Sequence, residues 1–171
     1  MRTLALVLVL AGEGAAVAAS GTGTAKTTTL SALGIVNQAP LDFGNIIPNA
    51  GGTVTVNAQT GAATHVGVIA AGGGTISPAR FIVAATPGRT VSFTLTPNNN
   101  LVLNRIGGGA SMTVQQFRVS FDGGAPTPIG PNRTVPAIGA ITIQIGGRLT
   151  VGAAQLEGVY EGNFVLNVEY Q

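Results

Sequence analysis

Apolar and polar positions alternate along the last residues of the chain. The apolar set occupies every second position and consists of Phe164, Leu166, Val168 and Tyr170. Gly158, Tyr160 and Gly162 continue the same parity, and Asn163, Asn167 and Glu169 fall between. A period of two predicts a β-strand with one apolar and one polar face. Because chain ends are usually poorly ordered, such a regular closing strand indicates that the C-terminus pairs in a sheet or is presented to a partner.

The rest of the chain predicts short strands separated by glycine, proline and asparagine. Two segments alternate most clearly: residues 90–96, with Val91, Phe93 and Leu95 on one parity, and residues 140–145. Further strands are predicted at residues 30–36, 53–57, 65–70, 80–85, 112–122, 148–151 and 162–170, with breakers that include residues 48–52, 72–74, 97–100, 107–109 and 123–131. No window has the pattern of a long amphipathic helix, so we predict an all-β sandwich.

The N-terminal residues have the pattern of a secretory signal peptide. Arg2 is followed by a short apolar run from Leu4 to Ala11, and then by small residues that allow cleavage after Ala18 or Ala19. Glu13 departs from the preferred pattern, and a buried N-terminal strand is the alternative. The apolar run is too short to span a membrane. We therefore expect a signal peptide at residues 1–19, an exported protein and no stable membrane insertion.

Composition narrows the class of protein further. The 171 residues fit one domain, and an apolar content of 45% is enough for a core. Charged residues make up only 8%, and the eight Lys and Arg residues are scattered rather than clustered. An electrostatic surface for nucleic acid is therefore not expected. The chain has no cysteine, so the stability of an exported domain would come from packing without disulfides.

Residues for catalysis are few. His65 is the only histidine, no nucleophile motif accompanies it, and a strand residue without a chemical role is its simpler interpretation. The acidic residues fall in no recognisable motif, and Asp42 is interpreted as a turn-forming carboxylate at the start of a loop. The segment at residues 21–29 contains Gly, Lys and Thr, but Ala25 stands where a phosphate-binding loop needs glycine. We expect no enzyme activity, no cofactor and no metal site.

Several segments carry a family resemblance. They are LDFGNIIPNAGGTVTV, GVIAAGGG, PARFIVAATPGRTVSFTL, GGGASMTV and the closing GGRLTVGAAQLEGVYEGNFVLNVEYQ. Together they resemble a family of secreted bacterial domains of unknown function, which is itself similar to spore coat U type and archaic chaperone–usher pilins. LDFG and the G-x-Y-x-G stretch are the most specific parts, and the match covers about Leu41 to Gln171. The resemblance implies an immunoglobulin-like antiparallel β-sandwich and leaves the biochemical role poorly defined.

The likeness to pilins also implies a role for the last strand. In chaperone–usher pilins this strand has alternating apolar residues, a penultimate Tyr and a Gly fourteen positions from the end, and a periplasmic chaperone pairs with it. Here Tyr170 is penultimate and Gly158 is the fourteenth residue from the end. Phe164, Leu166 and Val168 supply the alternation. An ordinary sandwich strand that happens to be terminal is the alternative.

A pilin sandwich lacks one strand, and another subunit supplies it. The candidate donor is the N-terminal extension, residues 20–37, which precedes the domain at residues 38–171. Its register stays open: Leu30, Ala32 and Val36 share one parity, and Leu33 and Ile35 share the other. The segment could also be the domain's own first strand.

The hypothesis is a structural subunit of an extracellular fibre, a pilus or fimbria, assembled by donor-strand exchange. Its partners would be copies of itself, a periplasmic chaperone and an outer-membrane usher. The subunit would pass through the periplasm to the cell surface. The alternative is a self-contained secreted or surface module that binds a glycan or a protein, and a hydrolase ranks third.

Overall fold

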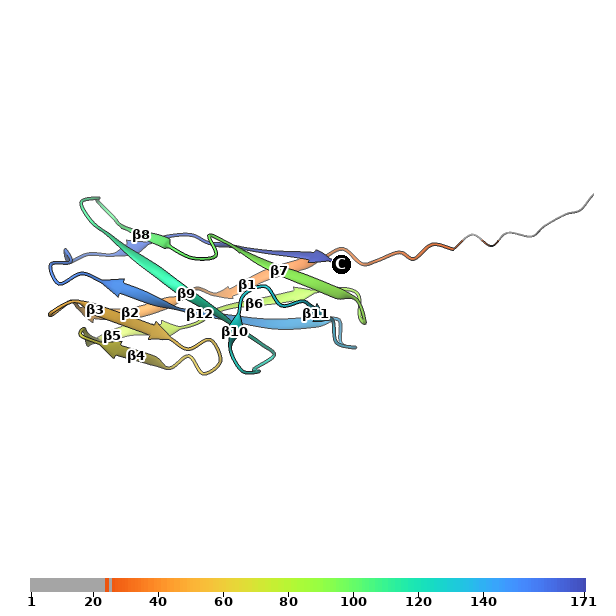
Figure 1. Ribbon diagram of the computed structural model, residues 1–171, viewed down its shortest axis with the longest axis horizontal. Helices are drawn as coiled ribbons and strands as arrows, with labels where there is room; N and C mark the ends of the chain where they lie inside the picture. Colours follow the sequence, from red (N-terminus) through yellow and green to blue (C-terminus); the bar gives the residue numbers. More distant parts are fainter. Residues whose placement is uncertain (1–23, 25) are drawn as a thin grey trace, which may run out of the picture.

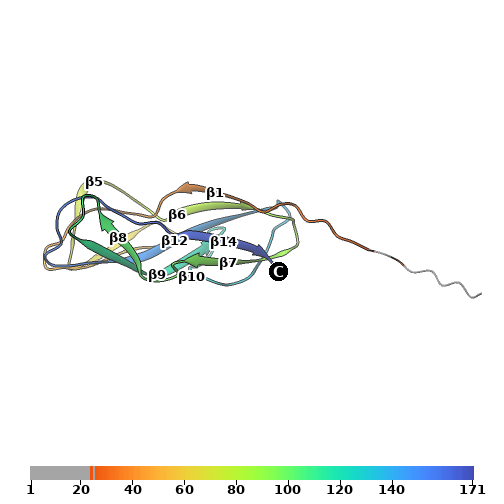
Figure 2. The same ribbon diagram turned by 90° about the horizontal axis from the view of Figure 1, so that it is seen from above.

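The computed structural model describes residue 24 and residues 26–171, and the expected signal peptide at residues 1–19 lies outside them. The described chain is an elongated antiparallel sandwich without helices, which confirms the predicted fold class (Figure 1). None of these residues forms a helix long and apolar enough to cross a membrane. The N-terminal segment leaves the body at the end where the chain also terminates, as both views show (Figures 1 and 2).

Most strands belong to one large sheet, which has the order β1-β6-β12-β9-β8-β13. These strands are β1 (Gly34–Ala39), β6 (Ala79–Ala84), β12 (Ala140–Val151), β9 (Ser111–Phe121), β8 (Leu101–Arg105) and β13 (Tyr160–Glu161). Three more attach to this path: β3 (Gly52–Val56) pairs with β12, β4 (Ala63–Val66) with β3, and β10 (Thr127–Pro128) with β9. In Figure 1, β9 runs diagonally from its hairpin with β8, and it lies beside β12 along most of its length.

Two smaller sheets complete the sandwich. One has the order β11-β7-β14 and contains β11 (Arg133–Thr134), β7 (Thr90–Thr96) and β14 (Val165–Tyr170). The other pairs β2 (Asp42–Ile47) with β5 (Ile69–Ser77). β1 and β14 each pair with one strand only, β6 and β7 respectively, so each has an edge without a strand partner in the described part of the chain.

The core lies between the sheets and follows the predicted alternation. Ile141, Ile143 and Ile145 of β12 are fully buried, and so is Val91 of β7. Burying an aliphatic side chain of this size contributes about 1.5–3 kcal/mol, which makes this alternation the main source of stability in a domain without disulfides. Phe93 and Phe121 pack across the sheets with ring centroids 5.0 Å apart.

Several predicted boundaries were wrong. Residues 72–74 were predicted to break a strand but lie inside β5, where Gly74 lacks the Cβ that would overlap the backbone nitrogen of Asn45 in β2. Residues 140–145 and 148–151 were predicted as two strands and form one, because β12 continues past Gly146 with a shift of its register against β9. β2 and β8 were not predicted at all.

The N-terminal extension is partly integrated into the domain. The predicted strand at residues 30–36 begins instead at Gly34 and continues to Ala39, pairing with β6 as the first strand of the large sheet. The expected boundary at residue 38 therefore falls inside β1. The strand buries little, since the side chains of Ile35 and Val36 are 45% and 61% exposed. Leu33, just before it, is half-buried against the core.

Candidate functional site: an apolar groove between β2 and the C-terminal segment

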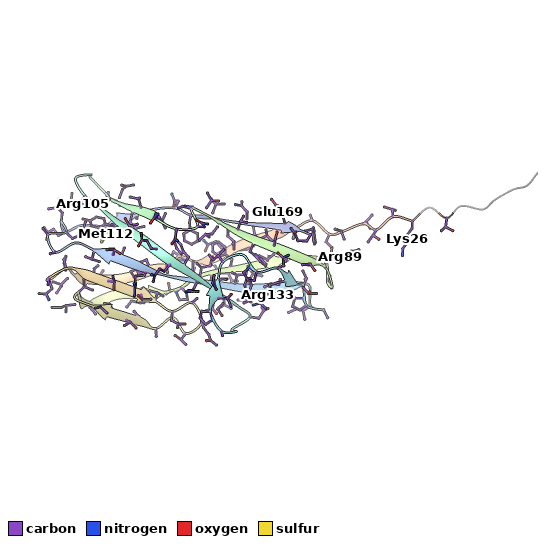
Figure 3. The ribbon with its side chains drawn as sticks, viewed as in Figure 1. Lys26, Arg89, Arg105, Met112, Arg133 and Glu169 are labelled. Carbon is purple, nitrogen blue, oxygen red and sulfur yellow. The ribbon has the colours of Figure 1, made fainter. Side chains whose placement is uncertain are left out.

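A groove of about 750 Å³ opens between β2 and the segment at residues 155–164. One wall is residues 40–48, and the other is the chain that leads into β14. The floor is formed by apolar side chains of β8, β9 and β12, namely Leu101, Leu103, Met112, Val114, Leu149 and Val151. The groove lies at the end of the molecule opposite the N-terminal segment, as the positions of Met112 and Lys26 show (Figure 3).

The LDFG stretch builds the first wall. The Asp42 carboxylate accepts a hydrogen bond from the backbone N–H of Gly44 at 2.8 Å, and the ring of Phe43 is buried in the core. The register between β2 and β5 shifts between Phe43 and Asn45: residues 72–75 of β5 lie opposite Gly44 alone, so the irregularity is a bulge in β5. The expected turn-forming carboxylate is present, but Asp42 begins a strand, not a loop.

The G-x-Y-x-G stretch builds the second wall. The hydroxyl of Tyr160 donates to the carbonyl of Leu156 at 2.6 Å and accepts from the side-chain amide of Gln155 at 2.7 Å. Gly158 has φ of 140°, a conformation that residues with a side chain rarely adopt. At Gly162 a Cβ would overlap the carbonyl oxygen of Val102 in β8. Because Gly158 and Gly162 have no Cβ, this segment lies close to β8. The hydrogen bond between Tyr160 and Leu156 closes a loop in the segment.

Phe164 closes the inner end of the groove. Its ring lies 6.2 Å from the ring of Phe81 in β6 and 5.9 Å from that of Phe117 in β9, measured between centroids. Aromatic pairs at these separations stabilise the contact between the layers. The side chain is half-buried, since one side lines the groove.

The strand β14 continues the second wall and has the predicted faces. Leu166 is buried, Phe164, Val168 and Tyr170 are half-buried, and Asn167 and Glu169 are exposed. The alternation that the sequence predicted is therefore confirmed in the burial of the side chains. β14 pairs with β7 through all six of its residues, and the edge that faces away from β7 has no strand partner among the described residues. The role of this strand in binding a chaperone stays a prediction.

Tyr170 closes the seam between the sheets at the other end of the molecule. Its hydroxyl donates to the carbonyl of Ser31 at 3.0 Å and accepts from the backbone N–H of Thr86 at 2.7 Å. The hydroxyl of Thr86 in turn accepts from the backbone N–H of Ser31 at 2.7 Å. The penultimate Tyr thus ties the N-terminal segment to the turn between β6 and β7. The sequence shows that Tyr170 is penultimate, but it does not indicate that Ser31 and Thr86 are the partners of its hydroxyl.

The candidate donor residues fall into two groups. Ile35 and Val36 belong to β1 and pair with residues of β6, and Leu33 packs on the core. Leu30 and Ala32 lie in the extended segment before β1 and are exposed. The structure does not bring these residues to the groove of their own chain.

The histidine lies apart from the groove. His65 lies on β4, outside the groove lining, with its Nε2 atom buried and without a hydrogen-bond partner. Within the part of the chain that the structure describes, no group of three or more His, Cys, Asp or Glu side chains could hold a metal ion. The groove has an apolar floor, and its lining also includes the carboxylates of Asp42, Glu157 and Glu161.

The fold and the groove define an antiparallel β-sandwich with an apolar groove open at one end. Residues 33–170 match the model of a domain of unknown function, DUF4402. The chain belongs to this family. The match includes β1, so the residues assigned to the end of the extension are part of the family domain. No curated protein matches the chain.

Proposed function

We propose that the protein is a structural subunit of an extracellular fibre and that its groove receives a strand from another copy. The observation that supports this most is the groove itself, about 750 Å³ in volume with an apolar floor, lined on one side by β2, which among the described residues pairs with β5 only. Addition of an extended strand would supply backbone hydrogen bonds to an open edge and side chains to the groove.

The energy of such an insertion is large on the scale of a domain. Four or five buried side chains at about 1.5–3 kcal/mol each would contribute roughly 6–15 kcal/mol. The net stability of a whole domain is about 5–15 kcal/mol. A subunit with an empty groove would therefore be much less stable than the same subunit in a fibre, and dissociation of the fibre would be slow.

The N-terminal extension is the proposed donor, with Leu30, Ala32, Leu33, Ile35 and Val36 as its apolar residues. Release of β1 from β6 would break backbone hydrogen bonds worth about 0.5–1.5 kcal/mol each. Ile35 and Val36 are already 45% and 61% exposed, so their release would expose little new apolar surface, whereas Leu33 would leave its contact with the core. Donation of this segment to another copy thus replaces poorly buried side chains by well-buried ones.

Export and assembly factors belong to the same proposal. The signal peptide pattern and the resemblance to spore coat U type and archaic chaperone–usher pilins support transit through the periplasm, a chaperone and usher as partners, and a position on the cell surface. The two stretches on which that resemblance depends most, LDFG and G-x-Y-x-G, form the two walls of the groove. The chaperone would hold the groove until another copy replaces it.

The test shortens the donor and keeps β1 intact, because it removes Leu30 and Ala32 and leaves Leu33, Ile35 and Val36 in place. Deletion of residues 20–32 leaves the β1–β6 pairing in place, so the variant should fold and accept a donor but form no fibres. Heat-resistant, high-mass species in cell-surface extracts should disappear, and a synthetic peptide of residues 26–37 should raise the melting temperature of the variant.

The matched control is Asn167→Ala, which changes an exposed position of β14 and should leave the fibres unaffected. A full-length protein that stays monomeric, and a peptide that leaves the melting temperature of the deletion variant unchanged, would contradict the proposal. That result would favour a binding module with the groove as its ligand site.

A further inference from the structure

The two ends of the molecule differ in charge. Of the six acidic residues in the chain, three line the groove: Asp42, Glu157 and Glu161. Both glutamates are exposed to solvent, and Asp42 is half-exposed. One cation lies close by, Arg105, whose guanidinium donates to the carbonyls of Glu157 at 2.6 Å and Gly108 at 3.1 Å. The rim of the groove therefore carries net negative charge.

The end at which the N-terminal segment leaves has the opposite sign. Lys26 is the only lysine of the chain and lies on the extended segment beyond the body, and Arg89 lies on the turn before β7 (Figure 3). Arg133 lies in the same half of the molecule, stacked on Phe121, and the acidic residues there are Glu169 and Asp122, so three cations face two carboxylates (Figure 3). The hydrogen bonds of Ser31 to Thr86 and to Tyr170 hold the base of the segment at this end.

We propose that the acidic rim of the groove recognises the basic exit end of a second copy, with Lys26 of the donor facing Glu157 and Glu161 of the acceptor. The inference rests on the proposed function and adds the orientation of the partner to it. The apolar floor accepts Leu30 of the same donor segment, and the carboxylates of the rim accept the ammonium group. A donor without a cation near its apolar residues fits this rim less well.

The spacing of the donor residues agrees with the size of the site. In an extended chain Lys26 lies about 13 Å from Leu30, since each residue advances about 3.3 Å. The wall formed by the six residues of β2 is about 20 Å long by the same measure. Both side chains therefore engage one groove at the same time.

The arrangement of the two ends determines the symmetry of assembly. Residues 26–33 and the groove-lining strand β2 lie at opposite ends of the long axis, and residues 26–33 extend away from the body (Figures 1 and 2). A contact between unlike ends is heterologous, so it extends head to tail rather than closing as a two-fold dimer. Because the charged groups are exposed, they act mainly on the rate and orientation of association, and salt weakens them.

The first test uses disulfide formation, which the natural chain does not complicate because it has no cysteine. Lys26→Cys and Glu161→Cys variants are produced together in the same cells, and cell-surface extracts are separated on a gel without reductant. We expect a disulfide-linked pair of copies. Lys26→Cys together with Glu169→Cys, an acidic position at the exit end, should give none. Linkage to position 169 but not to position 161 would overturn the inference.

The second test exchanges the charges. Lys26→Glu should slow assembly of the full chain about tenfold at low ionic strength, as expected for the loss of electrostatic steering. Adding Glu157→Lys and Glu161→Lys to the same chain should restore the rate. Arg118→Glu makes the same change of charge on β9, outside the groove, and should have no effect.

The outcomes separate this inference from the proposed function. Fibres whose assembly rate is insensitive to salt and to the Lys26→Glu change would contradict the charge recognition and leave the fibre subunit in place. A natural chain that never forms high-mass species would contradict both.

Discussion

The hydroxyl of Tyr170 donates a hydrogen bond to the carbonyl of Ser31, although 139 positions separate the two residues in the chain. The same hydroxyl accepts from the backbone of Thr86, so one side chain connects the C-terminal strand, the N-terminal segment and the turn between β6 and β7. Ser31 and the C-terminal strand are thereby held together at one end of the sandwich.

Tyr170→Phe should loosen this connection. The variant keeps the ring and loses the hydroxyl, which leaves the carbonyl of Ser31 and the N–H of Thr86 without their partner. We expect a loss of about 1–3 kcal/mol in the free energy of unfolding, measured by denaturant titration, and faster hydrogen exchange in residues 26–33. Glu169→Gln, at the exposed neighbouring position, should change the stability by less than about 0.5 kcal/mol. Equal stabilities of the two variants would refute this role of the hydroxyl.

Leu166→Asp should destabilise the domain by several kcal/mol, because the carboxylate would enter the core, where the natural side chain is 7% exposed. Asn167→Asp places the same carboxylate on the exposed face of β14 and should cost little. Denaturant melts of the two variants measure the difference. Similar losses at both positions would show that β14 is not half-buried in solution.

Leu103→Glu should prevent donor insertion. Leu103 is half-buried on the floor of the groove, and an inserted strand would bury the new carboxylate in apolar surroundings. Val102→Glu makes the same change on the same strand, at a side chain that is 45% exposed and outside the groove lining. Electron microscopy of cell-surface extracts should find fibres with Val102→Glu and none with Leu103→Glu. Fibres in equal number from both would argue against the groove as the acceptor.

Export predicts the first residue of the mature protein. Cleavage after Ala18 or Ala19 should leave Ala19 or Ser20 at the N-terminus, because the small residues there fit the cleavage pattern. Sequencing of the protein isolated from outside the cytoplasm measures this directly. An intact Met1 in that fraction would contradict the signal peptide.

The sequence predicted the strands whose two faces differ in polarity. Residues 90–96 form β7 with the predicted bounds, and Phe164, Leu166, Val168 and Tyr170 share the more buried face of the terminal segment as expected. Every second side chain of these strands is buried in the core, so the alternation can be read from the sequence of each strand alone. Because many such strands and no long amphipathic helix are predicted, the sequence indicates an all-β fold.

β2 and its partner could not be recognised in the same way. Its residues DFGNII contain a glycine and precede Pro48, which is the composition of a turn, and β5 contains three consecutive glycines. Each strand alone has weak local preference for extended structure. Their pairing depends on the close approach of two backbones, which no local pattern reports.

The groove itself was also beyond the reach of the sequence. Its walls come from residues 40–48 and 155–164, at opposite ends of the domain sequence. The LDFG and G-x-Y-x-G stretches were recognised as specific motifs, but their common site emerged only from the fold. Periodicity shows which side chains are buried and does not show where a layer of the sandwich is incomplete.

The placement of the groove and the donor segment at opposite ends of the long axis has a mechanical consequence. In a fibre built this way, tension runs along the inserted strand. The hydrogen bonds between antiparallel strands are perpendicular to the strands, so a pull along the fibre loads the whole ladder at once rather than one bond after another. Each joint would then resist extension with all of its hydrogen bonds and buried side chains together.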